Sequence, residues 1–164
     1  MYTHEKAQDG RTYSDFRLPE FEARDLSNKL VRSRDLLGRP TILAFLAQHC
    51  NHSVESLPIL AELAQSFGPK GYKVVGVFVN SGTAREVEYW VSFHQPGYER
   101  QYDVWVVEDI SVGDVVGSHL TPTYFIVDAD GQVQKKLVGF KTSEKVFTEL
   151  STVKSRRKEE KPHA

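Results

Sequence analysis

Residues 41–67 read TILAFLAQHCNHSVESLPILAELAQSF, and this stretch holds Cys50, the only cysteine of the chain. Its opening residues, 41–47, form a continuous apolar run, which is typical of a strand buried on both faces. From Asn51 onward apolar residues recur at helical spacing. We therefore predict a buried strand over 41–47 and a helix over 51–67, joined by a turn that carries Cys50.

The position of Cys50 favours a reactive thiol. A thiol at a helix N-terminus lies near unpaired backbone N–H groups and the positive end of the helix dipole, and both stabilise the thiolate. His49 and His52 flank the cysteine, and a protonated imidazole would add to this effect. Ser53 stands where a partner cysteine would complete a redox pair, and its hydroxyl is a candidate hydrogen-bond donor to the sulfur. An inert buried thiol and solvated loop histidines stay open as alternatives.

The composition indicates a single globular domain. The chain has 164 residues, with 21 basic and 22 acidic side chains mixed along most of its length. This balance provides no electrostatic footprint for nucleic acid, so we expect no nucleic-acid partner. No apolar run reaches the ~18 residues that a membrane-spanning helix requires, and residues 1–6 lack the apolar region of a secretory signal. A lone cysteine cannot form an internal disulfide, so cysteine usage does not indicate a redox compartment.

The remaining patterns predict an α/β fold. Expected strands lie at 16–19, 29–31, 72–79, 104–107, 123–128 and 133–138, and expected helices at 33–40, 83–94, 110–116 and 143–154. The first two strands should form an N-terminal hairpin, and Asp130-Gly131 between apolar runs predicts another. Alternating strands and helices followed by an antiparallel pair indicate a mixed central sheet with helices on both faces. We place the domain at 15–153, between a disordered segment at 1–14 and a charged, solvated tail at 154–164.

This order of motifs resembles the thioredoxin-like fold, and more closely the TlpA/ResA kind of thiol-disulfide oxidoreductase within the redoxin group. The resemblance extends over residues 15–150 and depends on the order and spacing of its motifs together. These are Asp15-Phe16-x-Leu18-Pro19, Leu36-x-Gly38-x-Pro40, Phe45-x-Ala47-x-x-Cys50-x-x-Ser53-x-x-x-x-Pro58, Leu120-Thr121-Pro122-Thr123-Tyr124-Phe125-Ile126-Val127-Asp128-x-Asp130-Gly131 and Gly139.

The resemblance implies an activity and a set of site residues. Cys50 corresponds to the attacking cysteine of the family, and Ser53 takes the place of its resolving cysteine, so the chain reads CxxS instead of CxxC. The family proline at the position of Pro122 is in the cis form, and the backbone before it, here Thr121, pairs with a substrate strand. The resemblance implies exchange with protein thiols and disulfides or with small-molecule thiols, with no cofactor and no metal. It also implies a location outside the cytoplasm behind an N-terminal anchor, with a cytoplasmic protein as the alternative.

We therefore expect Cys50, Ser53 and Pro122 as catalytic residues, and His49, Asn51, His52, Glu55 and Thr121 as supporting or substrate-binding residues.

The chain departs from the family at three positions around Cys50. His49 replaces the usual Trp before the cysteine, and Ser56 stands where the family has a buried acid, with Glu55 beside it. Ser53 is the largest departure, because a disulfide within one site needs two sulfurs. Cys50 can still form a mixed disulfide that an external thiol releases, which is monothiol exchange. Ser53 is either natural or a replacement for a resolving cysteine, and both alternatives stay open.

Three other functions stay open for the same residues. A binding module that keeps the substrate groove without turnover is the strongest rival. His49, Cys50 and His52, together with His119, offer imidazole and thiolate ligands for copper or zinc. Peroxide reduction by Cys50 is the third, although residues 44–49 contain neither the Pro nor the Thr that peroxiredoxins place before their cysteine.

Overall fold

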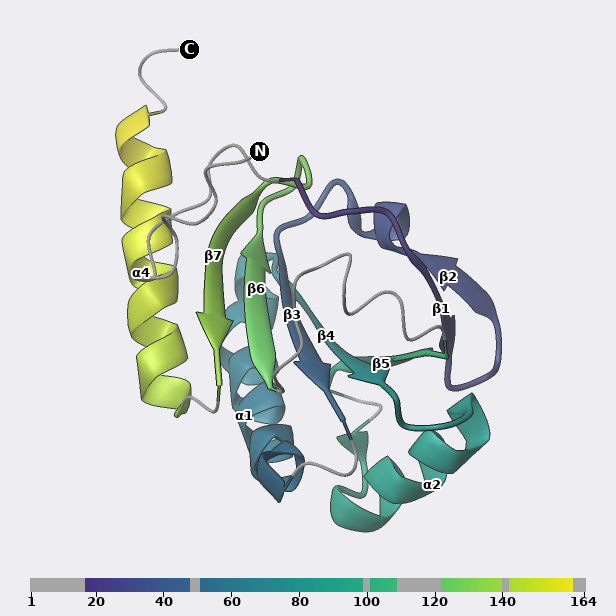
Figure 1. Ribbon diagram of the computed structural model, residues 1–164. Coiled ribbons are helices and arrows are strands. Elements are labelled where there is room, and N and C mark those ends of the chain that lie inside the picture. Colours follow the sequence, from purple (N-terminus) through teal and green to yellow (C-terminus); the bar gives the residue numbers. More distant parts are fainter. Residues whose placement is uncertain (1–16, 48–50, 99–100, 109–121, 140–141, 161–164) are drawn as a thin grey trace.

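The computed structural model describes residues 17–47, 51–98, 101–108, 122–139 and 142–160 (Figure 1). Within these ranges a seven-stranded sheet has the order β2-β1-β5-β4-β3-β6-β7. The strands are β1 (Glu22–Asp25), β2 (Leu30–Arg32), β3 (Thr41–Leu46), β4 (Lys73–Val79), β5 (Asp103–Val107), β6 (Thr123–Val127) and β7 (Val133–Val138). The helices are α1 (Asn51–Phe67), α2 (Ala84–His94) and α4 (Ser143–Glu160), with 3-10 turns η2 (Ser33–Leu36) and η3 (Gly68–Lys70). The predicted mixed α/β fold is confirmed.

The central strands β3, β4 and β5 run parallel, and β6 pairs antiparallel with β3. Every residue of β3 is buried, as its continuous apolar run predicted. Helix α1 follows β3 and α2 follows β4, with bounds within one residue of those predicted for both helices. Because the three strands are parallel, their carboxyl ends share one edge of the sheet. The residue after β3, Ala47, therefore lies at this edge.

Different elements pack against the two faces of the sheet. One face packs against α1, α2 and α4, with Leu60, Val87 and Val146 as buried contacts. The other face packs against Phe21 and Leu36 from the N-terminal region. Right-handed crossovers that proceed in one direction across a sheet keep their helices on one face, which explains why α1 and α2 lie together. The helix predicted over 110–116 lies outside the described residues, so the second face has no described α-helix.

The N-terminal hairpin is confirmed, but the prediction of its first strand was wrong. β1 runs over Glu22–Asp25 instead of 16–19. The carboxylate of Asp25 accepts hydrogen bonds of 2.9 Å from the backbone N–H groups of Ser27 and Lys29, and Asn28 has a φ of 69°. This turn reverses the chain directly after Asp25 and thereby fixes where the paired strand ends.

The carboxyl-terminal part contains the predicted hairpin and a longer helix than predicted. β6 and β7 pair antiparallel around Gly131, whose φ of 90° suits glycine. Helix α4 lies beside β7 (Figure 1) and ends at Glu160, beyond the predicted end at 154. No helix within the described ranges combines the length and the hydropathy that a bilayer crossing demands.

Candidate functional site

The candidate site lies where the carboxyl end of β3 turns into α1. Leu46 ends the strand, Ala47 follows it, and α1 begins at Asn51. The predicted residues His49, Cys50 and Thr121 lie outside the described residues, as does His119. The structure does describe the residues around the stretch that contains Cys50, and among them Ala47, Ser53 and Pro122 are called the frame of the turn.

Strand register brings Pro122 to this frame. Phe45 pairs with Thr123 in the antiparallel β3–β6 ladder, so Pro122 stands opposite Leu46 at the same edge of the sheet. Pro122 is buried, and its carbonyl accepts a 2.8 Å hydrogen bond from the backbone N–H of Gly139. The start of β6 is therefore anchored on both sides, by β3 and by the end of β7. The predicted cis form of the Thr121–Pro122 bond stays a prediction, because Thr121 lies outside the described residues.

Ser53 closes the turn from the helix side. Its side chain is fully buried, and its Oγ accepts a 3.2 Å hydrogen bond from the backbone N–H of Ala47. The same hydroxyl donates to the carbonyl oxygen of Ala47 over 2.6 Å. A hydroxyl carries one hydrogen, so in this arrangement Ser53 donates to the backbone at the end of β3. The sequence predicted a role for Ser53 toward the sulfur and missed this backbone contact.

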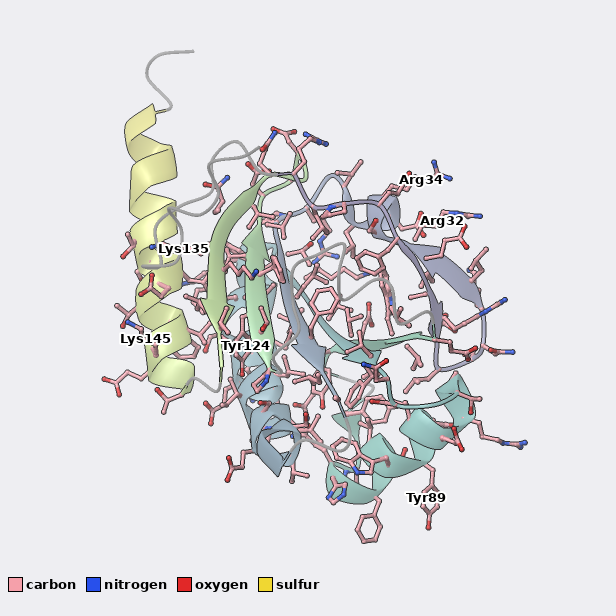
Figure 2. The ribbon with its side chains drawn as sticks, in the orientation of Figure 1. Arg32, Arg34, Tyr89, Tyr124, Lys135 and Lys145 are labelled. Carbon is pink, nitrogen blue, oxygen red and sulfur yellow. The ribbon has the colours of Figure 1, made fainter. Side chains whose placement is uncertain are left out.

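Two further buried hydroxyls meet one helical turn along α1 from Ser53, one on α1 and one on β6. Ser56 and Tyr124 are both fully buried, and the Tyr124 hydroxyl donates to Ser56 Oγ over 3.4 Å. Tyr124 is labelled in Figure 2. This distance is longer than is usual for an O–H···O bond. Burial raises the pKa of the Tyr124 phenol, and the hydrogen bond with Ser56 offsets only part of that rise, so the phenol is neutral at physiological pH. Sequence reasoning placed neither hydroxyl among the site residues.

The other predicted residues occupy the first two turns of α1. Asn51 and His52 begin the helix, and Glu55 is exposed on its next turn. The structure thus brings Ser53 and Pro122 to the same edge of the sheet, with Glu55 outside the buried frame. Among the described residues, no three His, Cys, Asp or Glu side chains gather closely enough to hold a metal ion.

Comparison with known proteins agrees with this architecture. The family model described as the AhpC/TSA family matches residues 15–136. Thiol-disulfide oxidoreductase ResA of Bacillus cereus is 28% identical over 132 residues, covering 78% of this chain and 71% of the relative. Thiol:disulfide interchange protein DsbE of Pseudomonas fluorescens is 28% identical over 130 residues, covering 79% of this chain and 66% of the relative.

Solved structures give the same fold. The Chlorobium tepidum protein assigned as thiol:disulfide interchange protein DsbE superposes with a TM-score of 0.72 at 20% identity, covering 84% of this chain and 94% of that one. The exposed lipoprotein thioredoxin of Streptococcus pneumoniae gives 0.68 at 23% identity, covering 84% and 99%. The resemblance drawn from the sequence motifs is confirmed. With its buried β3, its α1 turn and its Pro122 strand in these positions, the chain belongs to the AhpC/TSA family and has the thioredoxin-like fold.

Proposed function

We propose that this protein is a thiol-disulfide oxidoreductase that acts through one cysteine, Cys50. The observation that carries the proposal is the frame of the β3–α1 turn, where Ser53 and Pro122 border the stretch containing the only cysteine. The names of the ResA and DsbE relatives support the same reaction class. With serine at position 53, the site holds no second thiol for internal resolution.

The proposed reaction is an exchange of sulfur partners. The Cys50 thiolate attacks one sulfur of a substrate disulfide, forms a new S–S bond with it, and expels the other sulfur as a thiolate. A second thiolate from outside the site then attacks the mixed disulfide and regenerates the Cys50 thiolate. One disulfide is consumed and one is formed in each cycle, so the protein undergoes no net oxidation.

Several residues would assist this exchange. Pro122, with Thr121 before it, would position the substrate chain beside the turn, while His49, Asn51 and His52 would border the sulfur. Val54 follows Ser53 and is 39% exposed, so it offers an apolar contact on the outer side of the first turn. A peptide that carries a thiol or a disulfide fits such a surface better than a small ion does. Protein thiols and disulfides are therefore the proposed substrates, with small-molecule thiols as the releasing partner.

The proposed location is outside the cytoplasm. Two structural neighbours support it, one described as an exposed lipoprotein and one as a secreted disulfide oxidoreductase of Mycobacterium tuberculosis. Fractionation of the native host, followed by immunodetection of the chain, tests this location.

The reaction is tested by mass spectrometry of the reduced protein after incubation with glutathione disulfide. The incubation is carried out at about pH 8, where thiolates form. We expect one glutathione adduct per chain on Cys50, which a fresh thiol removes, and no adduct on Cys50→Ala. The matched variant Ser53→Cys supplies a resolving thiol, so its adduct should disappear into a 50–53 disulfide. A folded wild-type chain that gains no adduct, while the urea-unfolded chain does, would contradict the proposal and favour the binding module.

A further inference from the structure

Three buried hydroxyls interrupt an otherwise apolar packing surface between α1 and the sheet. Ser53 and Ser56 on α1 and Tyr124 on β6 are fully buried, whereas the helix continues inward with Leu57, Leu60 and Leu63 as members of the core. Burying a hydroxyl is unfavourable unless it finds a partner. Each of the three has one, and the partners connect α1 to two different strands.

Ser53 connects the first turn of α1 to β3. Its two hydrogen bonds, of 2.6 and 3.2 Å, both go to the backbone of Ala47. They tie the backbone directly after β3 to the first turn of α1. Cys50 lies between Ala47 and Ser53 in the sequence.

Ser56 connects the next turn of α1 to β6. Its Oγ lies 3.4 Å from the hydroxyl of Tyr124, and Tyr124 stands two residues after Pro122 in the chain. Tyr124 also pairs with Ala44 across the β3–β6 ladder. Strand β6, which begins directly after Pro122, is therefore held against α1, which begins directly after Cys50.

We infer that Ser53, Ser56 and Tyr124, here called the hydroxyl clamp, are positioning residues that hold the N-terminus of α1 against the Pro122 strand and thereby set the reactivity of Cys50. The effect of helix N–H groups and of the helix dipole falls off within one turn, so small displacements of α1 change thiolate stabilisation. This inference rests on the proposed role of Cys50 as a nucleophile.

The clamp adds no titration of its own between pH 4 and 10. Serine hydroxyls do not ionise there, and burial keeps the Tyr124 phenol neutral. The titratable side chains near Cys50 in the sequence are His49 and His52, together with Glu55, which is exposed on α1. Changes to the clamp should therefore move the midpoint of the Cys50 titration without adding or removing a second titration step.

The test compares Tyr124→Phe, Ser56→Ala and Ser53→Ala with a control variant, all made in the 164-residue chain. The control is Tyr102→Phe, which removes the hydroxyl of another buried tyrosine. Tyr102 donates to Gln95 and stands just before β5, at the sheet edge opposite to the one that holds Ala47. Iodoacetamide labelling of Cys50 from about pH 4 to 10 gives the midpoint for each variant. Circular dichroism and thermal melts identify any variant that is unfolded, and Tyr124→Phe is nearly isosteric, so a folded comparison is available.

We expect the clamp variants to raise the midpoint by about half a pH unit or more, which slows labelling about threefold near neutral pH. Tyr102→Phe should leave the midpoint unchanged. Folded Tyr124→Phe and Ser56→Ala proteins with wild-type midpoints would overturn the inference, as would an equal shift in Tyr102→Phe. Labelling reports on the thiol without a disulfide substrate. A shifted midpoint in a protein that forms no glutathione adduct therefore supports the clamp while contradicting the proposed exchange activity.

Discussion

Strand β6 is held by neutral groups at one end and by a carboxylate at the other. At its start, beside the candidate site, the Tyr124 hydroxyl contacts Ser56. After its end, the Asp128 carboxylate accepts hydrogen bonds of 2.9 and 3.0 Å from the backbone N–H groups of Asp130 and Gln132, and one of 3.0 Å from the side chain of Gln134. Contacts of the first kind persist across the pH range in which a thiol titrates. The site can thus keep its geometry while Cys50 changes charge, and at the far end of β6 hydrogen bonds to the Asp128 carboxylate hold the turn into β7.

Asp128→Ala should give the largest loss of stability. It leaves two backbone N–H groups of the β6–β7 turn without their acceptor, and hydrogen bonds to a charged group contribute more than neutral ones do. We expect a decrease of about 3 kcal/mol in the free energy of unfolding, measured by urea titration. Asp128→Asn keeps one acceptor oxygen and should lose about 1 kcal/mol.

The same Asp128→Ala protein tests whether the two ends of β6 are independent. Its Cys50 labelling midpoint should match that of the wild type, because the clamp at the start of the strand is unchanged. A shifted midpoint in a folded Asp128→Ala protein would show that the far end also positions the site.

The single variants Ser56→Ala and Tyr124→Phe, which each remove one hydroxyl of the Tyr124–Ser56 contact, should lower the free energy of unfolding by different amounts. Ser56 is the only hydrogen-bond partner of the Tyr124 hydroxyl within the described part of the chain, whereas Ser56 has a further interaction of its own. Ser56→Ala therefore leaves a buried hydroxyl unpaired and should lower the free energy of unfolding by about 1–3 kcal/mol. Tyr124→Phe should lower it by less than about 1 kcal/mol, because the 3.4 Å contact is long.

The double variant Ser56→Ala/Tyr124→Phe sharpens this comparison. With both hydroxyls removed, the phenol that Ser56→Ala leaves unpaired is gone, so the double variant should be more stable than Ser56→Ala alone in the same urea titration. Additive losses would mean that the two hydroxyls do not interact.

The sequence predicted the elements whose signals are local. The continuous apolar runs of β3 and β4 and the Asp130-Gly131 turn require no knowledge of distant residues, and these elements form as predicted. The start of β1 was wrong because short strands with mixed polarity are located by their turn, here by the hydrogen bonds of Asp25. The clamp was missed for a related reason, since Ser56 and Tyr124 are 68 positions apart and nothing in either segment marks the contact.

Within the site, the structure locates two of the predicted residues, Ser53 and Pro122, while the predicted roles stay predictions. The resemblance named Ser53 and Pro122 together as site residues, and the register of Phe45 with Thr123 brings Pro122 to the end of β3. The hydrogen bonds of Ser53 depend on how the turn closes, which a residue pattern does not specify.

Glu149 offers the smallest and most pH-dependent test of the charged part of the molecule. Its carboxylate lies 3.1 Å from Lys135 Nζ on β7 and 3.2 Å from Lys145 Nζ on α4. Both lysines are labelled in Figure 2. Burial alone would raise the pKa of Glu149, but the hydrogen bonds and charges of the two lysines outweigh burial and hold the pKa below its usual value. The folded state therefore favours the carboxylate, and this contribution to stability is present above the unfolded pKa of about 4.3 and is lost as the pH falls through the folded value.

Glu149→Gln should accordingly be less stable than the wild type by about 1 kcal/mol at neutral pH, since partly exposed ion pairs contribute modestly. The difference between the two unfolding free energies should shrink as the pH falls below about 4, and urea titrations across that range measure it. Glu62→Gln, on the exposed side of α1, is the matched control and should follow the wild-type profile. Parallel profiles for Glu149→Gln and the wild type would mean that α4 is held on β7 by apolar contacts alone. Asp128 would then be the only carboxylate in this comparison that is expected to stabilise the part of the fold away from the neutral hydroxyls of the site.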